Sequence, residues 1–314
     1  MKTIDLILPV YNEEQGVTLF HQALTRELDR LADRYRFHLI YVLDRSTDRT
    51  FDVLKDLAGQ RPGTTVIHLS RRFGHQLSLI AGLDHSTGDA AIMMDADLQH
   101  PPSVIPLLLA RFEDGHDIVQ TVRKYGDSER TSKQWASSVF YWLQNALSPV
   151  RIRDGMADFR LISRKVVRVF QTSVREHNPF LRGLFQWVGF TRSEVDFVSA
   201  PRVAGTTKYR LRRLLSFSLV GIVSFSKVPL RIATILGLFI AMLGGLYAVW
   251  LVLAFMRGGQ FPPGYMSLIM VVLFMGGLQL MFLGVLGEYL GSIIDEVKSR
   301  PLYIVDEVVN GRPA

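Results

Sequence analysis

The sequence predicts an α/β domain with a mostly parallel sheet, followed by an apolar helical tail that enters a membrane. Strand-like apolar runs alternate with helical patterns over roughly the first 200 of the 314 residues, an order typical of parallel sheets with crossover helices. Charged residues are regularly spaced up to residue 213 and are rare over 214–290. Polar residues follow the ends of several expected strands, which is where open α/β sheets bind ligands.

The elements of the α/β domain are expected in strict alternation. Each strand is a short apolar run and each helix repeats its apolar residues every three or four positions. The expected strands are Ile4–Val10, Phe37–Leu43, Thr65–Leu69, Ala90–Met94 and Asp117–Thr121. The expected helices are Glu13–Ala32, Thr50–Leu57, Gln76–His85 and Val104–Phe112.

Two stretches of the tail contain no charged residue, Ile232–Met256 and Gly264–Gly287. Either would span roughly 36 Å as a helix, enough for a hydrocarbon core of about 30 Å. Buried helices of a soluble protein are the alternative, but they rarely run so long without a charge. The short connection between the stretches carries one positive charge, at Arg257. The positive-inside rule therefore places both termini in the cytoplasm.

The segment before the first apolar stretch is basic in front and apolar behind. We expect 209–228 to form an interfacial amphipathic helix; a third partial span is the alternative. The chain then divides into a cytoplasmic domain over 1–208, this helix, two transmembrane helices within 229–291 (about 232–256 and 264–287), and a cytoplasmic tail over 292–314. Gly287 and Gly291 form a small-xxx-small pair, which favours a homo-oligomer.

Composition restricts the partners and the chemistry. The chain has 36 basic and 29 acidic residues, a net charge of +7. Basic residues gather beside the apolar stretches, which favours lipid headgroups or a phosphate ligand over nucleic acid as the partner. There are no cysteines, so disulfides, thiolate nucleophiles and cysteine metal sites are excluded. Met1–Val10 lacks the pattern of a signal peptide, which favours a cytoplasmic first domain at the inner membrane.

Two carboxylates, Asp95 and Asp97, directly follow the expected fourth strand. Mg²⁺ or Mn²⁺ binds through one or two carboxylates and completes its shell with water and phosphate oxygens. We therefore predict a metal site at Asp95 and Asp97, assisted by Gln99. Surface turns often contain the same Asp-x-Asp pattern, so its position after an apolar strand matters. The histidines are dispersed and show no zinc-site spacing.

Asp44 ends the second expected strand. A carboxylate at that edge can accept a hydrogen bond from the imide of uracil or from a base amine. Helix capping by Ser46 or Asp48, ahead of Thr50–Leu57, is an ordinary structural explanation of the same run. Both interpretations can hold, because Asp44 precedes the cap.

Several motifs in one order resemble a known family. Leu8–Glu14, the turn at Asp44 and the segment Asp95–Gln99 resemble inverting family-2 glycosyltransferases with a GT-A fold. Other runs resemble the polyprenyl-phosphate branch of that family, which includes dolichol-phosphate mannose synthases and bacterial undecaprenyl-phosphate glucosyltransferases. These runs are Leu69–Gly74, Asp158–Leu161, Arg182–Gly189, Gly205–Tyr209 and Gly287–Gly291.

The resemblance implies a GT-A-like domain and roles for particular residues. Pro9, Tyr11, Glu13 and Asp44 would line the nucleotide pocket. Asp95 would bind the sugar or the metal, and Asp97 the metal.

The second-strand turn departs from the family pattern at Leu43 and Arg45, where a polar residue and a glycine are usual. If that glycine needs a positive φ, Arg45 costs roughly 1 kcal/mol there.

Asp158 is the third acidic residue that the resemblance assigns to catalysis. A phosphate monoester acceptor is largely dianionic at neutral pH, because its second pKa is about 6. It is thus already a nucleophile, and we expect Asp158 to orient the acceptor or Arg160 more than to take a proton. A cap, or an ion pair with Arg160 or Arg164, is the structural alternative.

Two anionic substrates need positive charge in the site. The candidates to contact the acceptor phosphate or the diphosphate are Arg123, Arg130, Lys133, Arg202 and Lys208.

The resemblance implies a metal-dependent inverting hexosyltransferase. It would move a sugar, glucose from UDP-glucose in the favoured version, to undecaprenyl phosphate at the cytoplasmic membrane face. GDP-mannose or a UDP-aminoarabinose derivative is the alternative donor. The rivals from other classes are an inactive membrane scaffold and a transporter; two spans give little polar lining for transport.

Overall fold

The computed structural model describes residues 1–124, 155–198, 228–257 and 264–311. It contains one sheet of eight strands in the order β7-β5-β6-β4-β1-β2-β3-β8. The strands are β1 (Lys2–Val10), β2 (Tyr35–Leu43), β3 (Thr64–Leu69), β4 (Ala90–Met93), β5 (Ile118–Lys124), β6 (Met156–Ser163), β7 (Arg192–Val198) and β8 (Val305–Val309).

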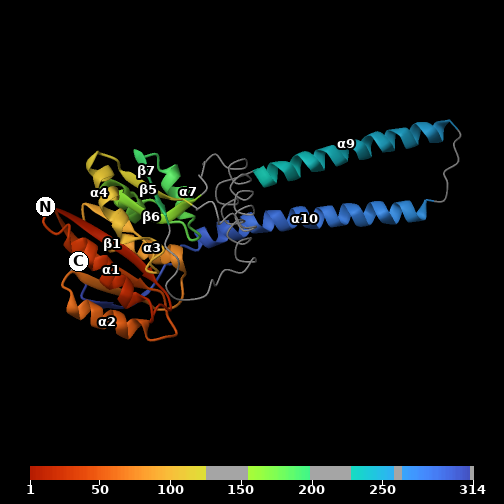
Figure 1. Ribbon diagram of the computed structural model, residues 1–314. Helices are drawn as coiled ribbons and strands as arrows, with labels where there is room; N and C mark the ends of the chain where they lie inside the picture. Colours follow the sequence, from red (N-terminus) through yellow and green to blue (C-terminus); the bar gives the residue numbers. More distant parts are fainter. Residues whose placement is uncertain (125–154, 199–227, 258–263, 312–314) are drawn as a thin grey trace.

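Helices cover both faces of the sheet, so the domain has three layers with the sheet in the middle (Figure 1). One face carries α1 (Val17–Asp29), α2 (Thr50–Gln60) and α4 (Ile105–Glu113), the last preceded by a 3₁₀ turn at Pro102–Val104. The other face carries α3 (His75–Asp84), α6 (Arg164–Thr172) and α7 (Leu181–Trp187). The described part of the domain thus has the α/β architecture, with a mostly parallel sheet, that the sequence predicts.

β1 shows why the strands read as continuous apolar runs. Ile4, Leu6 and Leu8 pack into the core under α1 and α2, while Ile7 points into the core under α3. All four side chains are fully buried. A strand covered on both faces has no solvent side and therefore lacks the apolar–polar alternation of a half-exposed strand.

The strand β1 and the strands β2, β3 and β4 run in the same direction. β1 pairs in parallel with β2 and with β4, and β2 pairs in parallel with β3. β6 is antiparallel to both β4 and β5. The carboxyl ends of β1, β2, β3, β4 and β5 consequently meet at one edge of the sheet.

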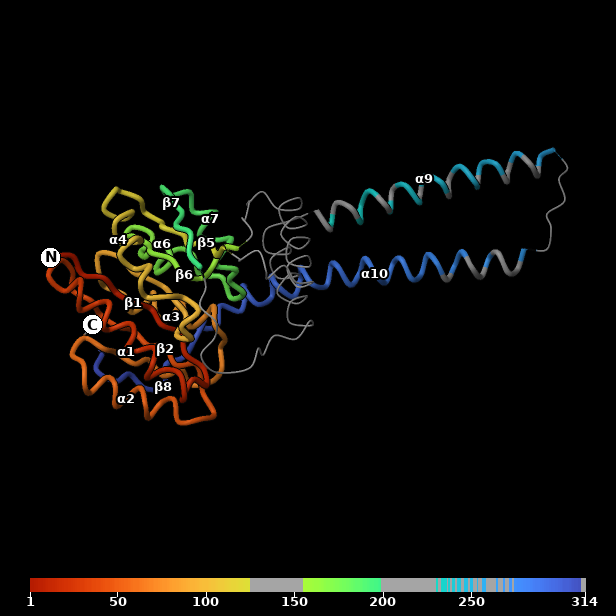
Figure 2. Tube along the Cα trace, in the orientation of Figure 1, coloured from red at the N-terminus to blue at the C-terminus, as the bar shows by residue number. Residues whose placement is uncertain are grey.

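The C-terminal segment supplies the edge strand of the sheet on the β3 side. The strand β8 spans Val305–Val309 and pairs antiparallel with β3 of the same chain. Before β8, the side chain of Leu302 is buried in the core beside α3 and α7. The trace in Figure 2 shows this segment returning from the helical tail to the sheet domain.

Two long helices project from the domain, α9 (Val228–Met256) and α10 (Tyr265–Val297), and they lie side by side (Figures 1 and 2). α10 continues beyond the apolar stretch that ends at Gly287, through Glu288 and on to Val297. Among the described residues, one helical stretch, Phe274–Val297, is long and apolar enough to cross a membrane. The expected amphipathic helix at 209–228 lies almost wholly outside the described residues.

The C-terminal end of α10 is attached to the domain through His177, which lies between α6 and α7. The His177 backbone N–H donates to Glu296 Oε1 at 2.8 Å, and Nδ1 lies 3.0 Å from Glu296 Oε2. Nε2 lies 2.7 Å from the Arg300 carbonyl oxygen. Both ring nitrogens face acceptors, so the ring donates at both positions only as the imidazolium. The hydrogen bond to Glu296 accordingly raises the pKa of His177 above 6.5.

We expect this attachment to weaken as the pH rises. A group whose pKa is raised by folding contributes its full stability below its unfolded pKa, here 6.5, and loses it as the pH passes the folded value. Hydrogen exchange at the end of α10, corrected for intrinsic rates, should quicken with pH in the wild type. His177→Leu should exchange rapidly at every pH. An identical pH response in the variant would contradict the assignment.

Close helix–sheet packing predicts a stability difference between two glycines. A Cβ on Gly82 in α3 would lie 2.2 Å from Ile7 Cγ2, whereas a Cβ on Gly59 in α2 meets nothing within 4 Å. Gly82→Ala should destabilise the fold by about 1–3 kcal/mol through overpacking. Gly59→Ala should stabilise it by up to about 1 kcal/mol through helix propensity. Thermal unfolding of both variants in detergent checks this, and equal shifts would refute it.

Candidate functional site

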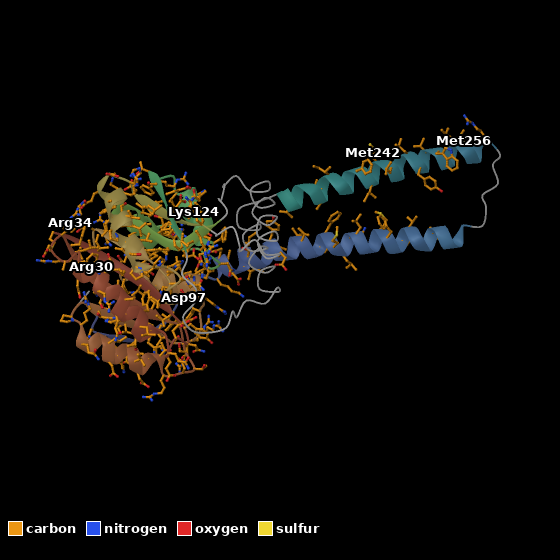
Figure 3. The ribbon with its side chains drawn as sticks, in the orientation of Figure 1. Arg30, Arg34, Asp97, Lys124, Met242 and Met256 are labelled. Atoms are coloured by element: carbon orange, nitrogen blue, oxygen red, sulfur yellow. The ribbon has the colours of Figure 1, made fainter. Side chains whose placement is uncertain are left out.

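The candidate site lies where β1 and β4 end. The crossovers from β1 through β2 to β3 proceed in one direction, and β4 then pairs on the other side of β1. Such a reversal leaves a crevice beyond the carboxyl ends of the two strands, which is the usual ligand position in open α/β sheets. Figure 3 shows Asp97 on the side of the domain from which α9 and α10 project, while Arg30 and Arg34 lie on the far side.

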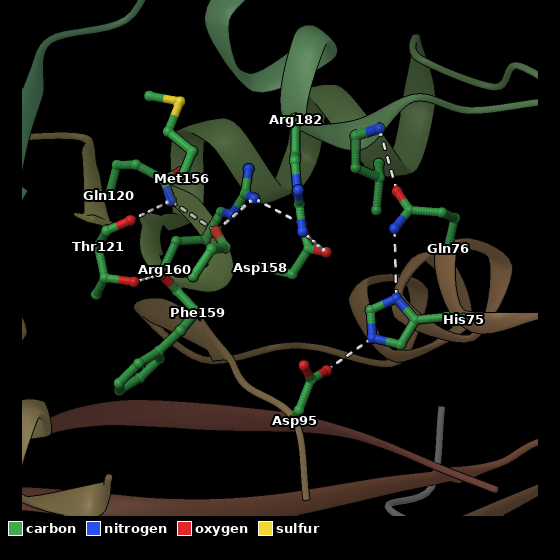
Figure 4. Close-up of polar contacts among 12 residues, drawn as sticks. His75, Gln76, Asp95, Gln120, Thr121, Met156, Asp158, Phe159, Arg160 and Arg182 are labelled. Atoms are coloured by element: carbon green, nitrogen blue, oxygen red, sulfur yellow. Dashed lines mark hydrogen bonds and ion pairs between the residues drawn. The ribbon is translucent and has the colours of Figure 1, made fainter. Parts of the chain in front are cut away.

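Asp95 is held by two histidines. Its Oδ1 lies 2.7 Å from His75 Nε2, and its backbone N–H donates to His100 Nδ1 at 3.0 Å (Figure 4 shows the first contact). His100 is buried and stacks on Phe159 with ring centroids 5.2 Å apart. Removal of water around Asp95 would raise its pKa, but His75 and His100 outweigh that effect and lower the pKa to about 2. The carboxylate therefore stays ionised at any physiological pH.

The chain turns sharply after Asp97. Asp97 Oδ1 accepts the Gln99 backbone N–H at 3.1 Å, and Leu98 between them has a φ of 62°. The left-handed region costs a branched residue roughly 1–2 kcal/mol, and such strain clusters at functional sites. The turn holds Asp97 against Gln99 in the segment that follows β4 and Asp95.

The carboxylates at this edge suit a cation that its substrate completes. In the part of the chain that the structure describes, no three His, Asp or Glu side chains converge as a ready-made metal cage. Mg²⁺ does not need one, because it binds through one or two carboxylates plus water and substrate phosphates. Asp95 and Asp97, with oxygen donors directly after a buried strand, fit that mode of binding.

The loops after β1 and β2 are joined by side-chain hydrogen bonds. Asn12, with a φ of 52°, accepts the Thr47 N–H at 2.8 Å and donates its own backbone N–H to Ser46 Oγ at 2.9 Å. The Glu13 N–H donates to Thr50 Oγ1 at 3.0 Å. Short polar side chains tolerate the left-handed conformation because they bond locally. The loop that carries Tyr11 and Glu13 is thereby fixed against the loop that follows Asp44.

Two expected nucleotide-pocket residues also have defined surroundings. Pro9 lies within β1 and pairs with Val42 of β2, one residue before the strand ends. The Tyr11 ring packs under the guanidinium of Arg72, whose carbon lies 4.0 Å from the ring centroid. That distance is within the range of a cation–π contact. A cation therefore lies beside the expected nucleotide position.

Asp44 fixes the loop ahead of α3. It is buried, and its two oxygens accept the backbone N–H groups of Phe73 at 2.7 Å and Gly74 at 2.9 Å. The N-cap of α2 is Arg49, which makes no side-chain capping bond, so the expected cap at Ser46 or Asp48 is wrong. Asp48, one residue earlier, accepts the Thr50 N–H at 3.2 Å. Arg45 is not among the residues with positive φ, so the expected strain does not arise there. Its Nη1 donates to the Ser70 carbonyl oxygen at 3.1 Å.

Asp158 on β6 is engaged by two arginines. Arg182 donates through Nε and Nη2 to the two carboxylate oxygens, at 3.1 and 3.0 Å, and Arg160 Nη2 donates to Oδ1 at 3.0 Å (Figure 4). The expected pair with Arg160 is present, and Arg182 is a partner that the sequence did not indicate. Burial would raise the pKa of Asp158, but the two guanidinium groups outweigh it and hold the pKa well below its usual range.

The cationic candidates are only partly described. Arg123 is the penultimate residue of β5, and its backbone N–H donates to Gly155 at 2.8 Å. Arg130, Lys133, Arg202 and Lys208 lie outside the described residues. Sequence reasoning missed His75 and Arg182 as site residues, although both fall in or beside runs that resembled the family. The sequence did indicate that acidic residues in or after buried strands need cationic partners. It did not indicate which arginine or histidine side chains would lie beside them.

Comparisons with known proteins match two separate parts of the chain. Residues 5–170 match the model of glycosyl transferase family 2, and residues 228–293 match that of the GtrB C-terminal hairpin. The chain is 39% identical over 310 residues to an SfII prophage-derived bactoprenol glucosyl transferase of Shigella flexneri, covering 99% of each chain. It is also 39% identical over 305 residues to a prophage bactoprenol glucosyl transferase homolog of Escherichia coli, covering 97% and 99%.

A solved structure is more distantly similar. Glucosyl-3-phosphoglycerate synthase from Mycobacterium tuberculosis is 21% identical, with a TM-score of 0.44 over 71% of this chain and 78% of the other.

The buried ion pairs of Asp158 predict a large stability effect. Asp158→Asn keeps the size of the side chain but leaves the guanidinium of Arg160, 1% exposed, without its counter-charge. Breaking a buried pair in this way costs about 3–5 kcal/mol. Asp196→Asn is the matched control, because the Lys124–Asp196 pair is exposed and such pairs contribute about 0–1 kcal/mol. Thermal unfolding should separate the two variants; similar small shifts would show that Asp158 does not anchor the arginines.

Proposed function

The chain belongs to glycosyl transferase family 2, and on that premise we propose that it transfers glucose from UDP-glucose to undecaprenyl phosphate at the cytoplasmic face of the inner membrane. The observation that carries the proposal is the full-length similarity to bactoprenol glucosyl transferases. It extends over both the domain with the Asp95–Asp97 edge and the apolar helices. A lipid acceptor explains why these two parts occur in one chain.

The donor would lie across the edge formed by β1, β2 and β4. Pro9, Tyr11 and Glu13 would line the nucleotide pocket beside Asp44. Asp44 already accepts two backbone N–H groups, but a carboxylate has about four lone-pair sites and can accept a base imide as well. The cation of Arg72 over Tyr11 adds positive charge on the nucleotide side.

Asp95 and Asp97, assisted by Gln99, would hold Mg²⁺ or Mn²⁺. Such an ion neutralises the charge that develops on a nucleoside diphosphate leaving group. The turn at Leu98 supports this role, because the hydrogen bond from the Gln99 N–H holds the Asp97 carboxylate in place after β4. The low pKa of Asp95, about 2, keeps that carboxylate ionised.

For its attack on the donor, the acceptor phosphate needs nearby positive charge more than it needs a general base. A phosphate monoester is largely dianionic near neutral pH, so one of its oxygens can attack the anomeric carbon directly. The new C–O bond forms as the bond to the diphosphate oxygen breaks, the electron pair leaves with UDP, and the configuration inverts. Asp158 would not take a proton, because Arg160 and Arg182 hold it ionised. It would instead hold Arg182 in place.

The remaining cations would receive the acceptor phosphate or the diphosphate. We propose Arg123 at the end of β5, and Arg130, Lys133, Arg202 and Lys208 in the stretches between the described parts. An arginine presents a planar fork of donors that matches phosphate oxygens. In the sequence, Arg202 and Lys208 fall between β7 and the apolar helix α9, which suits a phosphate that is attached to a membrane lipid.

The helical tail would anchor the enzyme as two transmembrane helices, with the amphipathic segment at 209–228 on the membrane surface. α9 has 29 residues and α10 has 33, so each exceeds the length of about 20 residues that spans a bilayer. Gly276, Gly277, Gly284, Gly287 and Gly291 of α10 have open space where a Cβ would stand. These glycines allow close packing against another helix, which supports a homo-oligomer.

A transfer assay tests this function. Purified full-length protein in detergent is given Mg²⁺ or Mn²⁺, undecaprenyl phosphate and a panel of radiolabelled UDP- and GDP-sugars. We expect a lipid-linked product from UDP-glucose. Asp97→Ala should reduce transfer by about 10²–10³-fold, as the loss of one electrostatic stabiliser does. Asp114→Ala, at an exposed residue after α4, should leave it unchanged.

Other outcomes would replace the proposal. A product from GDP-mannose or a UDP-aminoarabinose derivative alone would keep the enzyme class and change the donor. Bound metal and lipid with no product from any sugar would favour an inactive scaffold. Equal activity of the two aspartate variants would remove Asp97 from the site.

A further inference from the structure

A chain of hydrogen bonds connects the start of α7 to Asp95 through two consecutive residues of α3. The Leu181 backbone N–H donates to Gln76 Oε1 at 3.2 Å, and Gln76 Nε2 lies 3.3 Å from His75 Nδ1. His75 Nε2 then lies 2.7 Å from Asp95 Oδ1. Figure 4 shows the chain running from the α7 side to the carboxylate.

The direction of every bond in this chain follows from its first member. A backbone N–H can only donate, so the Gln76 group that faces Leu181 is the amide oxygen. The Gln76 NH₂ group must then face His75 and donate to Nδ1. Nδ1 is therefore the unprotonated ring nitrogen, and Nε2 carries the proton that His75 donates to Asp95.

The doubly protonated ring is the alternative state. It carries a second proton in addition to the one on Nε2. That proton would sit on Nδ1, opposite the NH₂ group of Gln76. Rotating the Gln76 amide by 180° would place its oxygen opposite the Nδ1 proton. Its NH₂ group would then face the Leu181 N–H, so two donors would again face each other. One amide oxygen cannot serve both donors.

Both ends of the chain are fixed by the fold. His75 is the first residue of α3, and the backbone N–H groups of Phe73 and Gly74 just before it are bound by the buried Asp44. Leu181 is buried at the first position of α7. Its neighbour Arg182 is bonded to Asp158. The chain thus links the two carboxylates of the site through rigid elements.

We propose that His75 is a positioning residue: as the Nε2–H tautomer selected by Gln76, it occupies one oxygen of Asp95 and fixes the orientation of that carboxylate toward the donor. This rests on the proposed function, in which Asp95 contacts the sugar or the metal. Partners that orient a ligating group typically contribute 10–100-fold to metal affinity or activity. His75 does not itself touch the reacting atoms.

The first test compares two substitutions at His75 in the full-length enzyme. His75→Gln keeps an N–H donor near the position of Nε2, whereas His75→Leu keeps bulk and removes the donor. We expect His75→Leu to lower kcat by about 10–100-fold with little change in the KM for UDP-glucose, and His75→Gln to recover most of the loss. His116→Leu, at the amino end of β5 far from this edge, should behave as wild type.

A second test does not depend on turnover. In ¹⁵N-histidine-labelled protein, the two ring nitrogens of His75 report the tautomer, and the signal is assigned by its loss in His75→Gln. We expect a neutral ring with the proton on Nε2 in the wild type, and loss of that single tautomer in Gln76→Leu. An imidazolium, or a proton on Nδ1, would overturn the assignment. Equal kcat values for His75→Leu and wild type would overturn the positioning role.

Failure of this inference is separable from failure of the proposed function. If wild type transfers no sugar from any donor, the proposed function fails, while the tautomer measurement still decides the state of His75. If wild type is active and Asp97→Ala is not, the function stands, and the His75 variants alone decide the positioning role.

Discussion

The parallel pairing of β1 with both β2 and β4 is the constraint from which the site follows. β1 is fully buried beyond its first residues, and its register with both neighbours is continuous. The three strands therefore end at one edge, and each passes directly into a polar segment. Asn12, Asp44 and Asp95 stand within two residues of those ends. Because the strands are rigid, residues distant in sequence meet with little freedom to adjust.

The polar groups at that edge act mainly on one another. Asp44 binds two backbone N–H groups, which fixes the loop before α3. That loop places His75 beside Asp95, and Gln76 connects His75 to α7. α7 in turn supplies Arg182 to Asp158. A cluster so connected is preorganised, and a preorganised environment costs no reorganisation when charge moves during a reaction.

The attachment of the helical tail uses the same elements. Glu296 of α10 binds His177, which lies four residues before α7 begins. After α10, Leu302 enters the core and β8 covers β3, the strand that would otherwise be the sheet edge. Unpaired edges invite association with other chains, so β8 protects the sheet while it holds the tail. The tail is thereby attached to the domain at the segment that precedes α7, the helix that carries Arg182.

The sequence alone determined the α/β alternation, the apolar tail and the edge that carries Asp95 and Asp97. It did so because periodicity and strand ends are local properties that neighbouring residues encode. It also identified Asp158, but it left open whether a cap, Arg160 or Arg164 would be its partner. Tertiary structure decided that Arg160 and Arg182 share Asp158, that His75 meets Asp95, and that the last strand begins at Val305. These are contacts between residues far apart in the chain or on opposite sides of a turn, and only the packing of strands and helices sets which charges come within bonding distance.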